Sequence, residues 1–175
     1  MKKILVIVIL LILLQLCPSY RASAFEIKSP AFENNGVIPK QYTCDGINLS
    51  PSLSWSGISE GTKSLVLISD DPDAPAGTWT HWIMYNIPPL SKGLQDGVLP
   101  MQNLPHEAKQ GLNDFKKIGY GGPCPPSGTH RYFFKLYALD TKLNLEGSAT
   151  KKKLEDAMKG HVLTEAQIIG KYSRK

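Results

Sequence analysis

The chain has 175 residues, of which 42% are hydrophobic, and its formal net charge at pH 7 is +5, from 20 Lys and Arg against 15 Asp and Glu. Without residues 1–24, which hold three basic residues and no acidic one, 17 basic residues would face 15 acidic ones, for a charge of +2. No segment rich in Lys and Arg with interleaved aromatic residues remains after that loss, so the charge pattern does not indicate nucleic-acid binding.

The first 24 residues have the pattern of a secretory signal peptide. Two lysines precede an apolar run over residues 4–16, and Ala22 and Ala24 form a small-x-small cleavage motif. The run is shorter than the roughly 20 apolar residues that cross a bilayer, which disfavours a stable membrane span. A lipid anchor at Cys17 is a minor alternative, because Leu16 before it is not small. We therefore expect cleavage after Ala24 and a periplasmic or secreted protein.

Residues 25–175 are expected to form one domain, which at this size buries about two-thirds of its unfolded surface. This part of the chain contains two cysteines, Cys44 and Cys124. If they form a disulfide, the bond closes an 80-residue loop, from 124 minus 44, and stabilises the fold by roughly 4 kcal/mol in the chain-entropy model. The alternative is two separate buried thiols, and the spacing alone does not choose between them.

Six short segments predict β-strands, because they are rich in β-branched and aromatic residues and are bounded by Pro, Gly, Asn or Asp. They are residues 25–28, 53–55, 64–69, 81–87, 132–139 and 168–172. The segment 132–139 is apolar at nearly every position, which predicts a central strand that is covered on both faces.

One longer stretch predicts a helix that is capped by Ser148 or Thr150 and stops at Gly160. A shorter helical turn is expected within residues 103–109, although Pro105 interrupts that pattern. The fold class is therefore mainly β, with one or two helices at the periphery.

A cluster of acidic residues follows the predicted strand 64–69. Three carboxylates, on Asp70, Asp71 and Asp73, fall within four positions, and two prolines and a histidine, His81, follow them. Their mutual repulsion predicts a partner that shares the charge. The simpler alternative is a solvated turn in which Asp side chains cap backbone N–H groups. A calcium loop is disfavoured, because the third oxygen ligand, the glycine and the distal glutamate of an EF-hand do not follow.

A second unusual segment covers residues 120–132. Its Gly and Pro residues, which begin at Gly121, favour an irregular loop that brings backbone N–H groups close to a ligand. The strand after it presents His130 and Tyr132 on one face, because strand side chains alternate. Both segments thus bring a histidine to the end of an apolar strand.

Together the two segments resemble the signatures of the phosphatidylethanolamine-binding protein family, also called the Raf kinase inhibitor protein family, and in particular its shorter bacterial and archaeal branch. The first signature reads Asp71-Pro72-Asp73-Ala74-Pro75 followed by His81-Trp82. The second reads Gly122-Pro123-x-Pro125-Pro126 followed by His130-Arg131-Tyr132. The resemblance covers essentially all of residues 25–175.

The resemblance implies an antiparallel Greek-key β-sandwich with an anion pocket at one end, which in the family accepts phosphate or a phosphorylethanolamine head group. Asp70 falls outside the first signature and is expected to face solvent. By motif position, the pocket would be lined by Asp71, Asp73, Pro75, His81, Gly122, Pro123, His130 and Tyr132.

The chemistry of these residue types suits a phosphate-bearing ligand. A histidine that is paired with an aspartate is oriented and more readily protonated, so His81 and His130 can donate hydrogen bonds to phosphate oxygens. Tyr132 and the N–H groups of the second loop are expected to add donors, and the prolines to hold the geometry before binding. No cofactor is expected.

Two other kinds of function remain possible from the sequence. Two Asp and two His could form the metal site of a hydrolase, but neither an i, i+4 histidine pair nor a G-x-S-x-G motif is present, so we expect no enzyme and no metal site. The family also includes kinase and serine-protease inhibitors, which makes an extracytoplasmic protein partner a third hypothesis. No pattern in the sequence indicates an oligomeric state.

Overall fold

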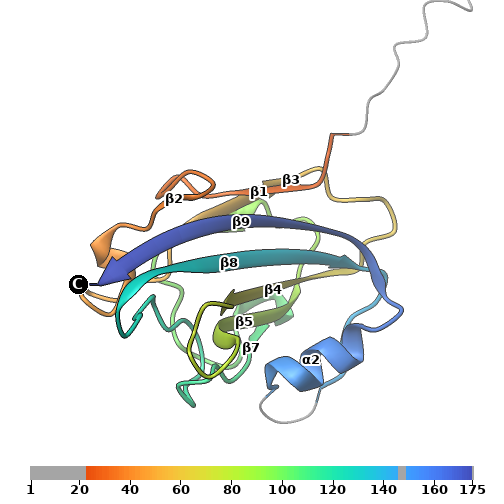
Figure 1. Cartoon of the computed structure of the whole chain (residues 1–175). Coiled ribbons are helices and arrows are strands. Elements are labelled where there is room, and N and C mark those ends of the chain that lie inside the picture. Colours follow the sequence, from red (N-terminus) through yellow and green to blue (C-terminus); the bar gives the residue numbers. More distant parts are fainter. Residues whose placement is uncertain (1–22, 146–148, 175) are drawn as a thin grey trace, which may run out of the picture.

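The computed structural model describes residues 23–145 and 149–174 (Figure 1). The expected signal peptide lies almost entirely outside these residues. Two β-sheets make up most of the described chain, a three-stranded sheet in the order β1-β3-β6 and a six-stranded sheet in the order β2-β9-β8-β4-β5-β7. Among the described pairings, β2 and β9 run parallel and the others are antiparallel. The expected mainly β class is confirmed.

All six predicted strands are present, and most of them extend beyond their predicted ends. The strands are β1 Glu26–Lys28, β2 Gly36–Val37, β3 Leu53–Ser56, β4 Ser64–Asp71, β5 Trp79–Ile87, β6 Gly93–Leu94, β7 Lys109–Gln110, β8 Gly128–Leu139 and β9 Val162–Arg174. The helical elements are the 3-10 turns η2 Lys40–Tyr42 and η3 Pro105–Glu107 and the α-helix α2 Lys151–Met158. The turn η3 lies within the segment 103–109 where a helical turn was expected.

The six-stranded sheet is covered on both faces at its centre, by the small sheet on one side and by α2 on the other (Figure 1). On β4, Leu65 and Leu67 pack toward the small sheet, and Val66 and Ile68 pack toward α2. Because strand side chains alternate, β4 is buried at all eight positions. The apolar run that begins β4 is thus explained by burial on two sides.

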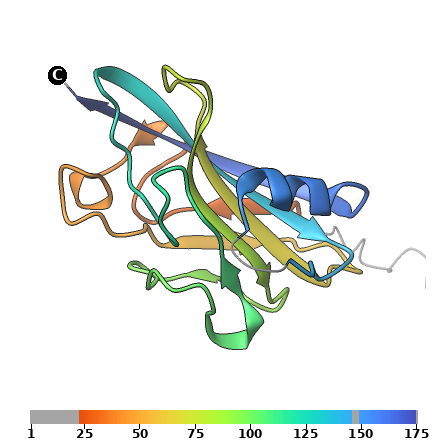
Figure 2. The same cartoon turned by 90° about the horizontal axis from the view of Figure 1, so that it is seen from below.

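Helix α2 packs on the sheet through Leu154 and Met158. The Thr150 side chain accepts a hydrogen bond from the backbone N–H of Lys153, so the cap is the second of the two predicted residues. Gly160, where the helix was expected to stop, has a φ of 78° and follows the last helical turn. In the six-stranded sheet, β7 and β5 lie toward one edge and β9 and β2 lie toward the other edge (Figure 2).

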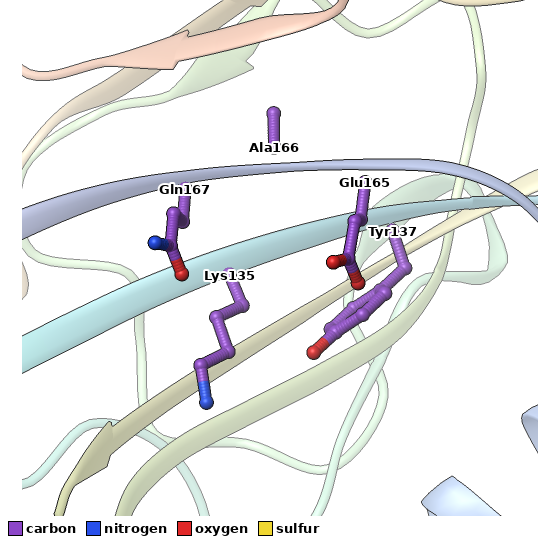
Figure 3. Close-up of a pocket in the computed structure, with 5 residues that line it drawn as sticks. All are labelled: Lys135, Tyr137, Glu165, Ala166 and Gln167. Atoms are coloured by element: carbon purple, nitrogen blue, oxygen red, sulfur yellow. The ribbon is translucent and has the colours of Figure 1, made fainter.

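Strand β8 lies inside the sheet, between β9 and β4, but its outer face is only half covered. Helix α2 packs mainly over β4 and β5, so the outward side chains Lys135 and Tyr137 stay half-buried. With Glu165 and Gln167 of β9 they line a polar cavity of about 430 Å³ (Figure 3). The prediction that this strand is fully covered on both faces was therefore wrong for its outer face.

The loop before β8 is tied to the segment around η2. Cys44 and Cys124 form a disulfide with a Cα–Cα distance of 5.4 Å, and the backbone N–H of Cys44 donates to the Pro123 carbonyl over 3.1 Å. The Tyr120 hydroxyl donates to the Tyr42 carbonyl over 2.8 Å. Of the two alternatives for the cysteines, the bonded one is found.

The structure also bears on membrane crossing. Within residues 23–145 and 149–174, helices are too short or too polar to cross a bilayer.

Candidate functional site

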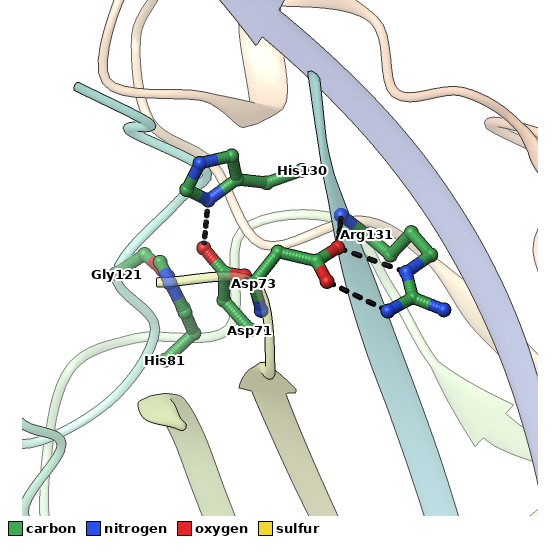
Figure 4. Close-up of polar contacts among 6 residues, drawn as sticks. All are labelled: Asp71, Asp73, His81, Gly121, His130 and Arg131. Atoms are coloured by element: carbon green, nitrogen blue, oxygen red, sulfur yellow. Dashed lines mark hydrogen bonds and ion pairs between the residues drawn. The ribbon is translucent and has the colours of Figure 1, made fainter. Parts of the chain in front are cut away.

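Asp71, the last residue of β4, connects the two signature segments. Its Oδ2 lies 2.7 Å from Nδ1 of His130 on β8, and its Oδ1 accepts the backbone N–H of Asp73 over 2.8 Å (Figure 4). Both side chains of the Asp71–His130 pair are nearly buried, with 5% and 10% of their surface exposed. Asp71 thus caps a backbone N–H group through Oδ1, as in the turn considered as an alternative, and it shares its charge with His130 through Oδ2.

This pairing determines which nitrogen of His130 can meet a ligand. A carboxylate only accepts hydrogen bonds, so Nδ1 of His130 carries a hydrogen and donates it to Asp71. The remaining ring nitrogen, Nε2, is left to bind a ligand, as an acceptor in the neutral ring and as a donor in the protonated ring.

A β-bulge positions the second histidine. In the β4–β5 ladder Ser69 is opposite Trp82 and Asp70 is opposite Thr80, which leaves His81 as the extra residue. Bulges redirect a side chain that regular alternation would send to the other face. As a result, the His81 ring packs edge-on against Tyr132, with 5.2 Å between ring centroids.

His81 is also held through its Nδ1. This nitrogen lies 2.6 Å from the carbonyl oxygen of Gly121, which can only accept, so Nδ1 carries a hydrogen and Nε2 is an acceptor in the neutral ring. Only 3% of His81 is exposed, and this burial lowers the pKa of the imidazole, because the charged ring loses its hydration. The ring is therefore predominantly neutral near neutral pH in the free protein.

Tyr132 lies beside both histidines on the inner face of β8, as the alternation argument predicted. Its hydroxyl is buried and forms no hydrogen bond with the part of the chain that the structure describes. Burial, and after it the negative charge of Asp71, raise the pKa of the phenol, so the hydroxyl keeps its hydrogen. The phenol is therefore an O–H donor next to His81, with Asp71 and the Cys124 backbone near it.

Asp73, which was expected to line the pocket, pairs with Arg131 and not with a histidine. Its carboxylate accepts the backbone N–H of Arg131 and the Nε–H, both over 2.9 Å, and the Nη2–H over 2.6 Å. The reason is geometric: His130 and Arg131 are neighbours on β8 and face opposite sides, so Asp71 contacts one and Asp73 the other (Figure 4). The guanidinium lowers the pKa of Asp73 to about 2.

Asp70 does not face solvent, which corrects the prediction for that residue. Strand β4 continues to Asp71, so Asp70 points to the α2 side of the sheet and is fully buried. Its carboxylate lies 2.7 Å from Nζ of Lys151, at the start of α2, and 3.2 Å from Nζ of Lys135. The acidic segment thus divides its charge among a histidine, an arginine and two lysines.

Gly122 and Pro123 are buried, and their backbone groups are already used inside the protein. The Gly122 N–H donates to Oδ1 of Asn48 over 2.8 Å. A Cβ at this position would come within 2.4 Å of the same oxygen and 2.5 Å of the Tyr42 carbonyl oxygen, so glycine permits the close approach. The Gly121 N–H donates to the carbonyl of His81. These two N–H groups of the second loop are therefore not available to a ligand in this structure.

Pro75 lies in an exposed turn, where the Gly77 N–H donates to the Ala74 carbonyl over 3.1 Å. Phe115, which the sequence did not single out, packs edge-on against His81, with 5.3 Å between ring centroids, and against Trp79, with 5.5 Å. A single aromatic residue in a polar loop was the only signal for it.

The residues that the structure brings together are thus Asp71, His81, His130 and Tyr132, which we call the histidine cluster. Across residues 23–145 and 149–174, no three His, Cys, Asp or Glu side chains are grouped so as to hold a metal ion. The cluster presents a phenol donor and two imidazole Nε2 atoms, which bind oxygen atoms of an anion when either the ring or the anion supplies the hydrogen.

Comparison with known proteins identifies the family. The profile of the family described as phosphatidylethanolamine-binding protein matches residues 28–173. The chain therefore belongs to the phosphatidylethanolamine-binding protein family, as the two signatures indicated. Among curated relatives, it is 57% identical over 148 residues to a UPF0098 protein of Methanothermobacter thermautotrophicus, an alignment that covers 85% of this chain and 98% of the relative.

Two solved structures resemble the fold over nearly their whole length. A phosphatidylethanolamine-binding protein homologue from Chlamydia trachomatis superposes with a TM-score of 0.80 at 43% identity, covering 87% of this chain and 99% of the other. YbcL of E. coli, described as a new member of the mammalian family, also gives a TM-score of 0.80, at 34% identity, covering 87% of this chain and all of the other.

Proposed function

We propose that the protein binds a small phosphate-bearing ligand, either inorganic phosphate or a phosphorylated head group, at the histidine cluster. The observation that supports this most is that His81 and His130 are both fixed through Nδ1, which leaves both Nε2 atoms as ligand-binding groups. Family membership supports a general binding role.

The charges of the cluster favour a ligand that brings protons with it. Asp71 repels an anion unless a hydrogen lies between them, which a monoprotonated phosphate or an ethanolammonium group supplies. The buried, neutral His81 gains a favourable charge interaction if it becomes protonated beside phosphate oxygens. Binding is therefore expected to be coupled to proton uptake.

We propose binding without chemical turnover. Among the described residues, the hydrogen-bond partners of the two Nδ1 atoms are a carbonyl and a carboxylate, and the histidines contact no Ser, Thr or Cys side chain as an activated nucleophile would require. Cys124, the nearest thiol in sequence to His130, is in the disulfide.

We further propose that the protein acts outside the cytoplasm. The signal-peptide pattern of residues 1–24 supports this location, and so does the Cys44–Cys124 disulfide, since disulfides form and persist in oxidising compartments.

Calorimetric titration of residues 25–175 with inorganic phosphate and with phosphorylethanolamine tests the proposal. The variant His130→Ala should weaken binding at least about tenfold, because it removes a charge-assisted hydrogen bond worth about 1.5–3 kcal/mol. His161→Ala is the matched control: His161 also pairs through Nδ1 with an aspartate, Asp140, over 2.8 Å, but it is exposed and lies near the other end of β8.

Saturable binding that His130→Ala weakens and His161→Ala leaves unchanged would support the histidine cluster as the site. Binding that is equally strong in both variants would contradict it. Absence of heat from the folded wild-type protein would contradict it as well, and would favour the hypothesis of an extracytoplasmic protein partner.

A further inference from the structure

A second, apolar cavity lies away from the histidine cluster. It has a volume of about 870 Å³ and is bounded by the later half of β5, by β6 and by the loops around η3. Met84, Ile87 and Ala108 form its floor and belong to the core between the sheets. The cavity therefore extends to buried core residues, at the side of the sandwich where β5 and β7 of the large sheet and β6 of the small sheet lie.

The residues around the cavity are mostly apolar, and Ser91, Gln95 and His106 are the polar ones among the described residues. Among the residues that the structure describes, no Lys, Arg, Asp or Glu lines it, and His106 is its one titratable lining residue. At its rim Leu90, Leu99 and Met101 expose 89%, 63% and 45% of their surface. Apolar surface of this extent is unfavourable in water and is typical of a binding site.

Hydrogen-bonding groups around the cavity are largely satisfied within the protein. The N–H of Met101 donates to the Leu99 carbonyl, that of Leu104 to Ala108, and the Gln110 side-chain amide to the carbonyls of Leu99 and Met101. A peptide would need partners for its own backbone groups, whereas a hydrocarbon chain needs none. The occupant that this lining fits best is therefore a flexible apolar chain.

We propose that this cavity binds a single acyl chain, supplied by a free fatty acid or by a single-chain lipid. Its volume is within the range of about 300–1,000 Å³ that is usual for small-molecule sites. The two methionines that line it, Met84 and Met101, have flexible side chains that adapt to ligands of different shape. The site is independent of the histidine cluster and does not rest on the function proposed above.

Methyl NMR of methionine-labelled protein provides a direct test, because Met84 and Met101 line the cavity while Met158, the last residue of α2, packs on the other face of the large sheet. Titration with dodecanoate below its micelle concentration should shift the Met84 and Met101 resonances in a saturable way and leave Met158 unchanged. Dodecanol should bind with similar affinity, because no charged residue lines the cavity, and this comparison separates an acyl site from a carboxylate site.

Affinity should also depend on chain length. Each methylene added between octanoate and dodecanoate should tighten binding by about fourfold, as expected for complete burial of a methylene group. The variant Leu99→Asp should weaken dodecanoate binding more than tenfold. Ile47→Asp is the control, since Ile47 is 71% exposed and lies outside the cavity.

Excess phosphorylethanolamine should not displace dodecanoate, and His130→Ala should keep the acyl site intact, so failure of one proposal is distinguishable from failure of the other. Equal shifts at Met158, or a Leu99→Asp variant that binds like wild type, would overturn the acyl site. If the Met84 and Met101 resonances change with protein concentration in the absence of lipid, the acyl site would also be overturned, and the cavity would be an interface between copies of the protein.

Discussion

Neighbouring residues on strands β4 and β8 contact different partners, because their side chains point to opposite faces of the sheet. Asp71 contacts His130 on the inner side, and Asp70 neutralises Lys151 beneath α2. On β8, Arg131 holds Asp73 outside the cluster. A shift of one residue in either strand would exchange these environments, so the site depends on strand register more than on loop conformation.

The Asp73–Arg131 pair makes a testable contribution to acid stability. The folded pKa of Asp73 is about 2 instead of 3.8, so the pair stabilises the fold above pH 4, and this contribution is lost as pH falls from about 4 to about 2. The stability difference between wild type and Asp73→Asn should therefore be constant above pH 5 and shrink toward zero by pH 2. Urea unfolding at a series of pH values measures it.

A second variant separates the ion pair from other effects of the substitution. Arg131→Met breaks the same pair from the other side and should show the same convergence with wild type at low pH. A difference from wild type that persists at pH 2 in both variants would show that the stabilisation does not depend on the charge of Asp73.

At the scale of the elements, the apolar centres of the strands were predictable and their ends were not. Strand β9 was predicted over residues 168–172 but spans Val162–Arg174, because the mostly polar residues 164–167 separate the apolar pair at its start from the apolar positions that were recognised. The predicted end of β4 fell before Asp70, because the last two residues of this strand are charged. The two-residue strands β2, β6 and β7 are too short to have any periodicity.

The candidate site was predictable only in part, because sequence identifies residue types and not their partners. The pairing of His130 with an aspartate was expected, whereas the pairing of Asp73 depends on the direction of Arg131. The bulge at His81 depends on the pairing register of β4 and β5, and the contact of Gly122 with Asn48 joins segments that are distant in sequence. The positive charge of Arg131, next to His130 in the second signature, was the one sequence signal that could have predicted its ion pair with Asp73.

The disulfide stabilises the connection between η2 and the loop before β8. Its reduction should lower the free energy of unfolding by up to about 4 kcal/mol, because it closes an 80-residue loop. Urea unfolding with and without reductant measures the change, and the double variant Cys44→Ser/Cys124→Ser should reproduce it. Reductant should have no effect on the double variant; an equal effect would mean that reductant acts elsewhere.

At the scale of the whole molecule, the two proposed sites lie at different parts of β5, with His81 near its start and Met84 and Ile87 in its later half. If both proposals hold, one domain binds a polar and an apolar ligand at two sites that share no lining residue among the described ones.

Processing of the full chain is also testable at this scale. The sequence predicts cleavage after Ala24, so mature protein from a secreting bacterial host should begin at Phe25. Mass spectrometry of the protein recovered from periplasm or medium measures the start. A protein that keeps Met1 and stays in the cytoplasm would contradict the extracytoplasmic proposal, and Lys2→Glu/Lys3→Glu should reduce export.

The position of β9 has a consequence for the order of events during synthesis. This strand lies between β2 and β8, with Gly36 opposite Gly170 and Gly128 opposite Arg174. A nascent chain that has not yet reached residue 162 presents the twelve residues of β8 as an unpaired sheet edge, the kind of edge that recruits other chains into aggregates. Correct assembly therefore waits for the last segment to emerge, and a chaperone that shields β8 during this interval should raise the yield of folded protein.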